Sequence, residues 1–328
     1  METKFKTLRE FPVEEYLSPG SPMCAGCGAM LVLRVFHKAL GGNVVFVNAA
    51  GCLTLMQVYP YTPLKSSWMY TAFASAPAGA QGISDAFDIL IAKGRLSPGE
   101  RMQVVVLTGD GAAYDIGLQS SSGAIERGLD FYYLVYDNES YGNTGFQKSG
   151  ATPYGSSTST TPPTSLNPAG YTGVKKDLFE IWRSHKPPYV ATLAPSHVVD
   201  MLRKVEKASR LRGPKLFISL APCPTGWGFD SSEAVKVSRL AVDTGVWPLK
   251  EAVHGVVRHT VVPRALKPVE EYLRVQGRYR HLFTPHRQQQ AINHIQETVS
   301  RYWVSAAKAE GFEPPRLLET KPTTHRNT

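Results

Sequence analysis

Two polar residues that suit a hard metal ion follow two apolar runs near the middle of the chain. Asp110 stands between Gly109 and Gly111 after the run 104–107, and Asn138 follows the run 131–136. Carboxylate, amide and backbone carbonyl oxygens are ligands that Mg²⁺ accepts, often together with phosphate oxygens. The two glycines would let a pyrophosphate approach the backbone closely. These residues therefore predict a site for Mg²⁺ and a diphosphate.

The cysteines form a second candidate site. Cys24 and Cys27 make a Cys-x-x-Cys turn before a predicted helix at 29–40, whereas Cys52 and Cys223 each follow an apolar, strand-like run. In a cytosolic chain such cysteines favour metal or redox use over disulfides. Four thiolates suit either zinc or a [4Fe–4S] cluster, and their spacing does not choose between the two. The first pair alone also fits a zinc knuckle or a redox dithiol.

Both sites need strands that end at the same edge of a sheet. The order of an apolar run at 104–107, a helix-compatible segment at 116–127 and a second apolar run at 131–136 predicts a βαβ unit with parallel strands. Polar groups that hold ligands lie beyond the carboxyl ends of such strands. Strands and helices alternate from about residue 44 to 223. The pattern predicts an α/β fold with a doubly wound, mostly parallel sheet.

Three parts are expected along the chain: an N-terminal arm (1–22), an α/β domain carrying both sites (23–228), and a C-terminal helical extension and tail (229–328). No separate set of catalytic residues is evident in the third part. The Ser, Thr and Pro-rich segment 151–170 follows the metal motif directly, and we expect an ordered loop over the site rather than a flexible linker.

Composition limits the classes of function. The chain has 328 residues, of which 42% are hydrophobic and 19% charged, enough for a sizeable core. Its formal net charge is +9, but the basic residues are scattered and no basic run is interleaved with aromatic residues, so nucleic-acid binding is not expected. No apolar stretch is long enough for a membrane span, and the charged N-terminus lacks the apolar core of a signal peptide. These features predict a cytoplasmic protein.

The motifs resemble those of a known family. The GDG at 109–111 followed by Asn138 resembles the thiamine diphosphate (TPP) and Mg²⁺ motif of TPP enzymes. The continuation NESYGNTGFQKSGATP at 138–153 resembles the β subunit of the 2-oxoacid:ferredoxin oxidoreductases, most closely the pyruvate:ferredoxin oxidoreductase group. The segments CAGCG, GC and PCPTGW match that family at each cysteine. The resemblance extends from about Cys24 to Leu282.

The resemblance implies a TPP-binding fold and a set of site residues. In this family Asp110 and Asn138 would bind Mg²⁺ by their side chains and Ser140 by its backbone carbonyl. Asn143 would reach the thiazolium and substrate, where its amide can stabilise a developing oxyanion. The remaining cofactor-binding positions would be Gly109, Gly111, Thr144, Cys52 and Leu53, and the [4Fe–4S] ligands would be Cys24, Cys27, Cys52 and Cys223.

The resemblance also implies a reaction and a set of partners. Members of the family oxidatively decarboxylate a 2-oxoacid, commonly pyruvate, to an acyl-CoA and CO₂ and pass the electrons to ferredoxin. An α subunit would supply most of the substrate pocket and the glutamate that activates the aminopyrimidine of TPP. A γ subunit and a ferredoxin-like δ subunit, or equivalents, would complete the complex. The chain alone is therefore expected to be inactive.

The motifs also allow other interpretations. A non-oxidative TPP decarboxylase shares the GDG and Asn motif, although such enzymes usually have much longer chains and need no convergent cysteines. A zinc-stabilised α/β scaffold subunit, in which GDG is only a turn, accounts for the four thiols. A nucleotide-binding protein is disfavoured, because neither a P-loop nor a strand-linked GxGxxG motif is present.

Overall fold

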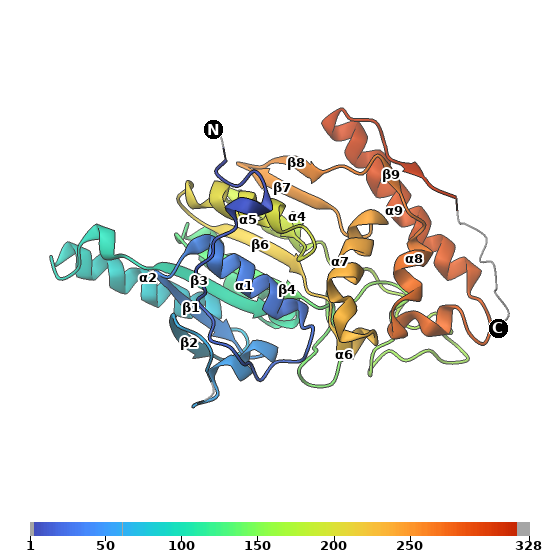
Figure 1. The fold of residues 1–328 in the computed structure, drawn as a ribbon, viewed down its shortest axis with the longest axis horizontal. Helices are drawn as coiled ribbons and strands as arrows, with labels where there is room; N and C mark the ends of the chain where they lie inside the picture. Colours follow the sequence, from blue (N-terminus) through green and yellow to red (C-terminus); the bar gives the residue numbers. More distant parts are fainter. Residues whose placement is uncertain (1–2, 61, 320–328) are drawn as a thin grey trace.

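An eight-stranded sheet runs through the part of the chain that the computed structural model describes, residues 3–60 and 62–319 (Figure 1). In order across the sheet, the strands are β2 (Ser67–Thr71), β1 (Val44–Ala49), β3 (Gln103–Gly109), β4 (Tyr132–Asp137), β6 (Lys215–Leu220), β5 (Tyr189–Leu193), β7 (Leu249–Val253) and β8 (Val256–Val261). The strands from β2 to β5 in this order are parallel. β7 and β8 continue the sheet in the antiparallel sense. The predicted α/β class is confirmed.

Side chains alternate between two buried faces of this sheet. In β4, Tyr132 and Leu134 pack on one face, whereas Tyr133 and Val135 pack on the other. Successive residues of a strand point to opposite sides, so a strand covered on both faces is apolar throughout. This is why the strand regions appear in the sequence as uninterrupted apolar runs.

Helices cover both faces. On the first face, α1 (Gly28–Leu40) and α5 (Val198–Ser209) pack against each other, as Figure 1 shows. The helices whose side chains join the core of the second face are α2 (Ala76–Ala92), α3 (Leu118–Glu126), α4 (Leu178–Arg183), α7 (Ala234–Asp243), α8 (Val269–Arg274) and α9 (Gln289–Glu310). A short helix, α6 (Pro224–Trp227), follows β6 directly.

The central unit has the predicted strand, helix, strand order with one difference. A π-helical turn, Gly111–Ile116, precedes α3, so the chain is helical immediately after the GDG motif. At Gly117 a Cβ atom would lie 2.7 Å from the carbonyl oxygen of Ala112, so the junction needs glycine. β3 and β4 pair in parallel, which brings the carboxyl ends of both strands to one edge.

The terminal parts of the chain lie against the sheet layers. The arm before α1 is held by Arg203 of α5, whose Nε donates to the carbonyl oxygen of Phe5 over 2.7 Å, and by a bridge between Leu17 and Leu64. After β8, the short strands β9 (Ala265–Leu266) and β10 (Arg316–Leu317) pair with each other. β7 and β8 belong to the main sheet, so the segment 229–328 contributes strands as well as helices. The domain boundary at 228 stays a prediction.

The serine- and threonine-rich segment 151–170 is an ordered loop. Ser157 N–H donates to the carbonyl oxygen of Arg278 over 2.9 Å, and Gly155 N–H donates to that of Tyr171 over 2.7 Å. Thr152 and Ser156 are completely buried. The loop therefore packs between the metal motif and a 3₁₀ turn at Gly277–Leu282. Within the described ranges, no helix has the length and apolar character needed to cross a membrane.

Candidate active site

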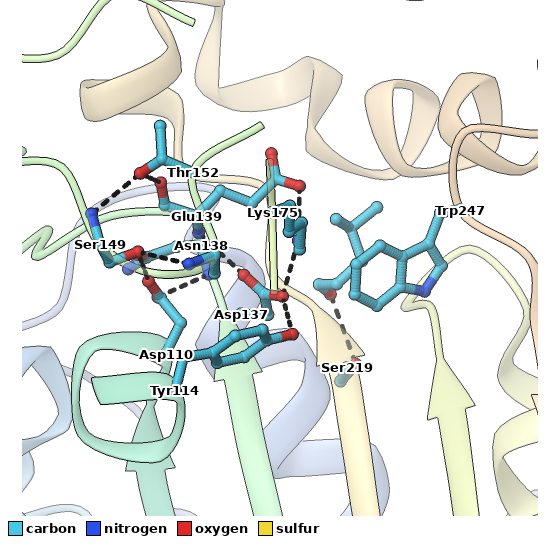
Figure 2. Close-up of polar contacts among 12 residues, drawn as sticks. Asp110, Tyr114, Asp137, Asn138, Glu139, Ser149, Thr152, Lys175, Ser219 and Trp247 are labelled. Atoms are coloured by element: carbon cyan, nitrogen blue, oxygen red, sulfur yellow. Dashed lines mark hydrogen bonds and ion pairs between the residues drawn. The ribbon is translucent and has the colours of Figure 1, made fainter. Parts of the chain in front are cut away.

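Asp110 and Asn138 meet at the carboxyl ends of β3 and β4, where the sequence places them. Asp110 is fully buried and accepts a hydrogen bond from the backbone N–H of Asn138 over 3.2 Å. Its other oxygen, Oδ2, accepts from the Ser149 hydroxyl over 2.5 Å (Figure 2). Ser149 lies within the segment 138–153 that carries the family resemblance, but it was not among the predicted site residues. Its hydroxyl fixes the orientation of the Asp110 carboxylate.

Asp110, Asn138 and Ser140 present polar atoms to one point. The Asn138 side-chain amide lies 2.7 Å from the carbonyl oxygen of Ser140 and 2.9 Å from Asp110 Oδ1, and its nitrogen donates to both in the orientation that satisfies these acceptors. A cation bound there would take the amide oxygen as a further ligand, with the amide turned over. Carboxylate, amide and carbonyl oxygens are the ligand types that Mg²⁺ takes in proteins. The three residues predicted to bind Mg²⁺ are thus brought together.

The electrostatics of Asp110 suit a positively charged ligand. Burial raises the pKa of this carboxyl group well above its usual range, and the nearby Asp137 raises it further. The hydrogen bond from Ser149 acts in the opposite direction. A carboxylate in this environment is costly when ionised and without a cation. A bound metal ion would provide the missing positive charge.

Steric crowding is a second reason for glycine on both sides of Asp110. A Cβ atom at Gly111 would lie 2.3 Å from the ring of Tyr141, and one at Gly109 would lie 3.1 Å from the ring of Tyr136. A Cβ atom at Gly51, before Cys52, would lie 2.6 Å from the Tyr136 hydroxyl. Two tyrosine rings therefore occupy the space that side chains would take. A role for Gly109 and Gly111 in diphosphate binding stays a prediction.

The other predicted cofactor-binding residues lie in different environments. Asn143 and Thr144 are exposed in a turn at 142–145, which a bridge between Tyr141 and Gln147 closes. Leu53 is completely buried in the core beneath α1. The turn leaves Asn143 free to meet a ligand or a second subunit, whereas the side chain of Leu53 packs in the protein interior.

The cysteine-bearing segments lie side by side although they are distant in sequence. Gly28 N–H, at the start of α1, donates to the carbonyl oxygen of Pro222 over 3.0 Å, which joins the Cys24–Cys27 turn to the Cys223 segment. Cys223 Sγ accepts from Gly226 N–H over 3.3 Å. Glycine is required at Gly28, because a Cβ atom there would lie 2.5 Å from the backbone nitrogen of Pro222.

The thiols lie within electrostatic range of one another. Burial raises the pKa of Cys52 to about 12, and Cys27, Cys223 and Cys24 add to the rise. Burial likewise raises the pKa of Cys27 to about 11. Over residues 3–60 and 62–319, no three His, Cys, Asp or Glu side chains are positioned to hold a metal ion as they stand. The donor set of four thiols, none of them in a disulfide, has the chemistry that a [4Fe–4S] cluster or a zinc ion requires.

Two buried polar side chains near the cysteines lack partners. The Tyr136 hydroxyl and both polar atoms of the Asn48 side chain are buried without a hydrogen bond to any described residue. The Tyr136 hydroxyl lies near Cys52 and Asp110, whose charges both raise its pKa after the larger effect of burial. Buried polar groups are nearly always hydrogen-bonded, so these side chains have atoms available to water or a ligand near the carboxyl ends of β1 and β4.

A buried charge network that the sequence did not reveal surrounds Asn138. Lys175 Nζ lies 2.9 Å from both Asp137 Oδ2 and Glu139 Oε1, and Figure 2 shows it between the two carboxylates. The Tyr114 hydroxyl donates to Asp137 Oδ2 over 2.7 Å. The positive charges of Lys175 and Arg278 outweigh burial and lower the pKa of Glu139. The only sequence signal was the alternation of acidic residues on either side of Asn138.

A second cation completes this network. Arg278 is almost fully buried, and one of its guanidinium nitrogens lies 2.7 Å from Glu139 Oε2. Its guanidinium carbon lies 3.8 Å from the centre of the Trp227 ring. Glu139 itself has a left-handed backbone, with φ of 64°, which points its carboxylate toward the two cations. The network holds the backbone on both sides of Asn138.

The fold and the oxygen set at Asp110 define a TPP enzyme domain. Residues 49–218 match the model of the thiamine pyrophosphate enzyme C-terminal TPP-binding domain. The 2-oxoglutarate:ferredoxin oxidoreductase from Magnetococcus marinus, with 2-oxoglutarate, coenzyme A and succinyl-CoA bound, has a similar fold. The TM-score is 0.51 at 19% sequence identity, over 68% of this chain and 79% of that chain.

Two curated relatives identify the family. The chain is 45% identical to pyruvate synthase subunit PorB of Methanocaldococcus jannaschii, over 84% of this chain and 92% of the relative. It is 47% identical to pyruvate synthase subunit PorB of Methanothermobacter marburgensis, over 83% of this chain and 92% of the relative. The chain therefore belongs to the TPP-binding β subunits of the 2-oxoacid:ferredoxin oxidoreductases, as its motifs predict.

Proposed function

We propose that this chain is the β subunit of a pyruvate:ferredoxin oxidoreductase. The complex would convert pyruvate and coenzyme A to acetyl-CoA and CO₂ and would pass the electrons to ferredoxin. The meeting of Asp110, Asn138 and Ser140 at one point is the observation that carries the proposal, since these residues have the oxygen ligands with which a TPP enzyme would hold Mg²⁺. Pyruvate is favoured because the similar relatives are named pyruvate synthase subunits.

Neighbouring side chains hold the proposed Mg²⁺ ligands in position. Ser149 orients the Asp110 carboxylate, and the ion pairs of Asp137 and Glu139 hold the backbone around Asn138. The metal would neutralise the diphosphate of TPP at this edge of the sheet. Bound TPP supplies the electron sink that allows CO₂ to leave the 2-oxoacid.

The four cysteines would hold a [4Fe–4S] cluster next to the TPP site. Tyr136 supports this location, because its unpartnered hydroxyl lies near both Asp110 and Cys52 and can donate to a ligand atom there. A redox-active cluster gives the electrons a route away from the reaction, whereas zinc has no redox chemistry. Thiols that keep a cluster also need a reducing compartment, which favours the cytoplasm.

The substrate pocket would be completed by partner subunits. Asn143 and Thr144 lie in an exposed turn, so an α subunit that covers this turn would enclose the substrate against Asn143. The α subunit would also supply the glutamate that activates the aminopyrimidine, and γ and ferredoxin-like δ subunits would carry electrons onward. We assign the C-terminal part, 229–328, to subunit contacts in addition to the strands β7 and β8 that it adds to the main sheet.

Metal analysis of the anaerobically purified full chain tests the cluster and separates the two main readings of the thiols. We expect about four irons and four sulfides per chain, as one cubane cluster requires, with the matching visible absorption. One zinc without sulfide would instead favour a zinc-stabilised scaffold subunit. Replacing Cys223 by Ser is expected to remove most of the iron, whereas Asp110→Asn is expected to leave the iron content unchanged.

The assembled complex tests the reaction itself. Co-expression with the partner subunits should give pyruvate- and coenzyme A-dependent reduction of ferredoxin. Asp110→Asn should lower the affinity for Mg²⁺ and TPP by calorimetry. Decarboxylation without electron transfer would point to a non-oxidative TPP enzyme, and turnover by the isolated chain would refute the role assigned to the α subunit.

A further inference from the structure

A cavity of about 610 Å³ lies on the sheet face opposite α1 and α5. Residues of β5, β6 and β7 line it from the sheet, α9 lines the opposite side, and the segment 172–179 borders it. Its walls are mainly apolar and include Phe179, Ile218, Trp247, Leu273, Val299 and Tyr302. This volume is in the range of small-molecule binding sites. None of the predicted site residues lines this cavity.

A buried lysine faces the cavity without a counterion. Lys250 lies in β7, is only 6% exposed and is among the cavity-lining residues. Its Nζ lies 4.3 Å from the centre of the Phe179 ring and 5.2 Å from that of the Tyr302 ring. Within the described residues this ammonium group makes no hydrogen bond or ion pair. Lysines are almost never fully buried unless they are paired, so Lys250 lacks the partner that its position requires.

The acidic groups that face the cavity are already engaged elsewhere. Glu139 is paired with both Lys175 and Arg278. The Asp177 carboxylate accepts from the Glu180 backbone N–H over 3.1 Å and thereby caps α4. Neither carboxylate forms an ion pair with Lys250. The charges of Asp177, Glu180 and Glu310 favour its ammonium at longer range, but within the described residues no carboxylate contacts it.

Two other lysines of the cavity are paired, unlike Lys250, and the cavity-lining Arg301 is exposed and donates to the Thr298 hydroxyl. Lys175 lies between Asp137 and Glu139, and Lys176 Nζ lies 2.6 Å from Asp115 Oδ1 at the surface. Burial lowers the pKa of Lys250, and the charges of Asp177, Glu180 and Glu310 oppose this effect without reversing it. An anion in the cavity would replace the water that the Lys250 ammonium has lost.

We propose that this cavity binds a small carboxylate with an apolar body, whose negative charge pairs with Lys250. The apolar body would pack against Phe179, Trp247 and Tyr302, and the carboxylate would take the place beside the Lys250 ammonium. A phosphate is disfavoured, because it needs several converging donors and this position offers one ammonium between two aromatic rings. The proposal is independent of TPP and of the cysteine cluster.

Octanoate and octan-1-ol are suitable probes, because they share an apolar chain and differ in charge. Calorimetry with the full-length wild-type chain should show octanoate binding. In Lys250→Met the affinity for octanoate should fall by at least about tenfold, as expected for loss of a charged partner in a buried site. The affinity for octan-1-ol should change by less than about twofold, since the charge of Lys250 contributes little to binding a neutral ligand.

Three variants test whether a change in probe binding comes from the Lys250 charge, from misfolding or from another site. Lys250→Met removes an unpaired buried charge, so its stability should equal or exceed that of the wild type. Lys176→Met changes a lysine that borders the same cavity but is paired with Asp115, and it should leave octanoate binding unchanged. Ile295→Trp, which partly fills the cavity, should weaken the binding of both probes.

Three outcomes would overturn the proposal. Saturation of the wild-type chain by octan-1-ol without any octanoate binding would exclude an anion site. Equal octanoate affinity in wild type and Lys250→Met would remove Lys250 from the site. Unchanged binding of both probes in Ile295→Trp would place them outside the cavity. None of these results depends on iron, TPP or partner subunits, so they are separate from a failure of the proposed function.

Discussion

Replacement of Lys175 by Met tests the charge network around Asn138. The ammonium group is the shared partner of Asp137 and Glu139, each 2.9 Å away, and both carboxylates are nearly inaccessible to solvent. Without Lys175, Asp137 keeps the hydroxyl of Tyr114 and Glu139 keeps Arg278. The variant therefore leaves a buried carboxylate, Asp137, without a cation.

The size of the effect follows from this geometry. Removal of one partner from a buried ion pair typically costs 3–5 kcal/mol of folding free energy. The Lys175 side chain keeps 23% of its exposure, and each carboxylate keeps a second partner, so the lower end applies. We expect a loss of about 3 kcal/mol. Burial already raises the pKa of Asp137, and removal of the ammonium should raise it further.

Urea unfolding at neutral pH measures this loss. Lys176→Met is the matched control, because its pair with Asp115 is partly exposed and should cost less than about 1 kcal/mol. Adding Asp137→Asn to Lys175→Met removes the unpaired charge, so the double variant should lose less than the sum of the two single variants, by about 1–3 kcal/mol. A loss below about 1 kcal/mol for Lys175→Met, or strict additivity, would refute the network as a source of stability.

Three further predictions concern other buried groups. In the same urea assay, Tyr114→Phe should lower the free energy of unfolding by about 2 kcal/mol, because Asp137 loses a hydrogen bond. The matched variant Tyr136→Phe removes a hydroxyl without a hydrogen-bond partner and should stay within about 0.5 kcal/mol of wild type. In the metal-free chain, alkylation of Cys27, followed by mass spectrometry, should rise about tenfold per pH unit toward its pKa of about 11; a plateau near pH 8 would contradict this. Burial lowers the pKa of His37 to about 4 from an ordinary 6.5, so the folded chain should lose about 2 kcal/mol between pH 7 and pH 5, and His37→Phe should abolish this loss in urea titrations at the two pH values.

The part of the site built from local segments was predictable from the sequence. Asp110 and Asn138 each follow a strand directly, and parallel strands bring their carboxyl ends to one edge, so the strand pattern was sufficient to bring these two together. Ser140 was predicted from the family resemblance. The βαβ unit is confirmed for the same reason. The exact start of the helical segment was not predictable, because the π-helical turn after Asp110 depends on contacts of Ala112 and Gly117.

The rest of the site depends on contacts between distant segments. Lys175 lies in a stretch without regular structure, and Arg278 lies in a 3₁₀ turn, so neither has a periodic pattern that connects it to Asp137 or Glu139. The edge strand β2 was not predicted from the sequence, because it has only five residues and most of them are exposed. Ser149 was not recognised as a partner of Asp110, because a serine in a polar loop has no distinctive sequence signal.

The position of β6 constrains the order in which this chain can fold during synthesis. β6 follows β5 in the sequence but lies between β4 and β5 in the sheet. Until residue 220 has left the ribosome, β4 and β5 have no neighbour on their facing edges, and such edges are prone to pair with other chains. Cys223 follows immediately, and the bond from Gly28 to Pro222 forms only when β6 has inserted. The last thiol thus joins the others at the end of sheet assembly, so a cluster that needs all four can be loaded only after the parallel sheet is complete.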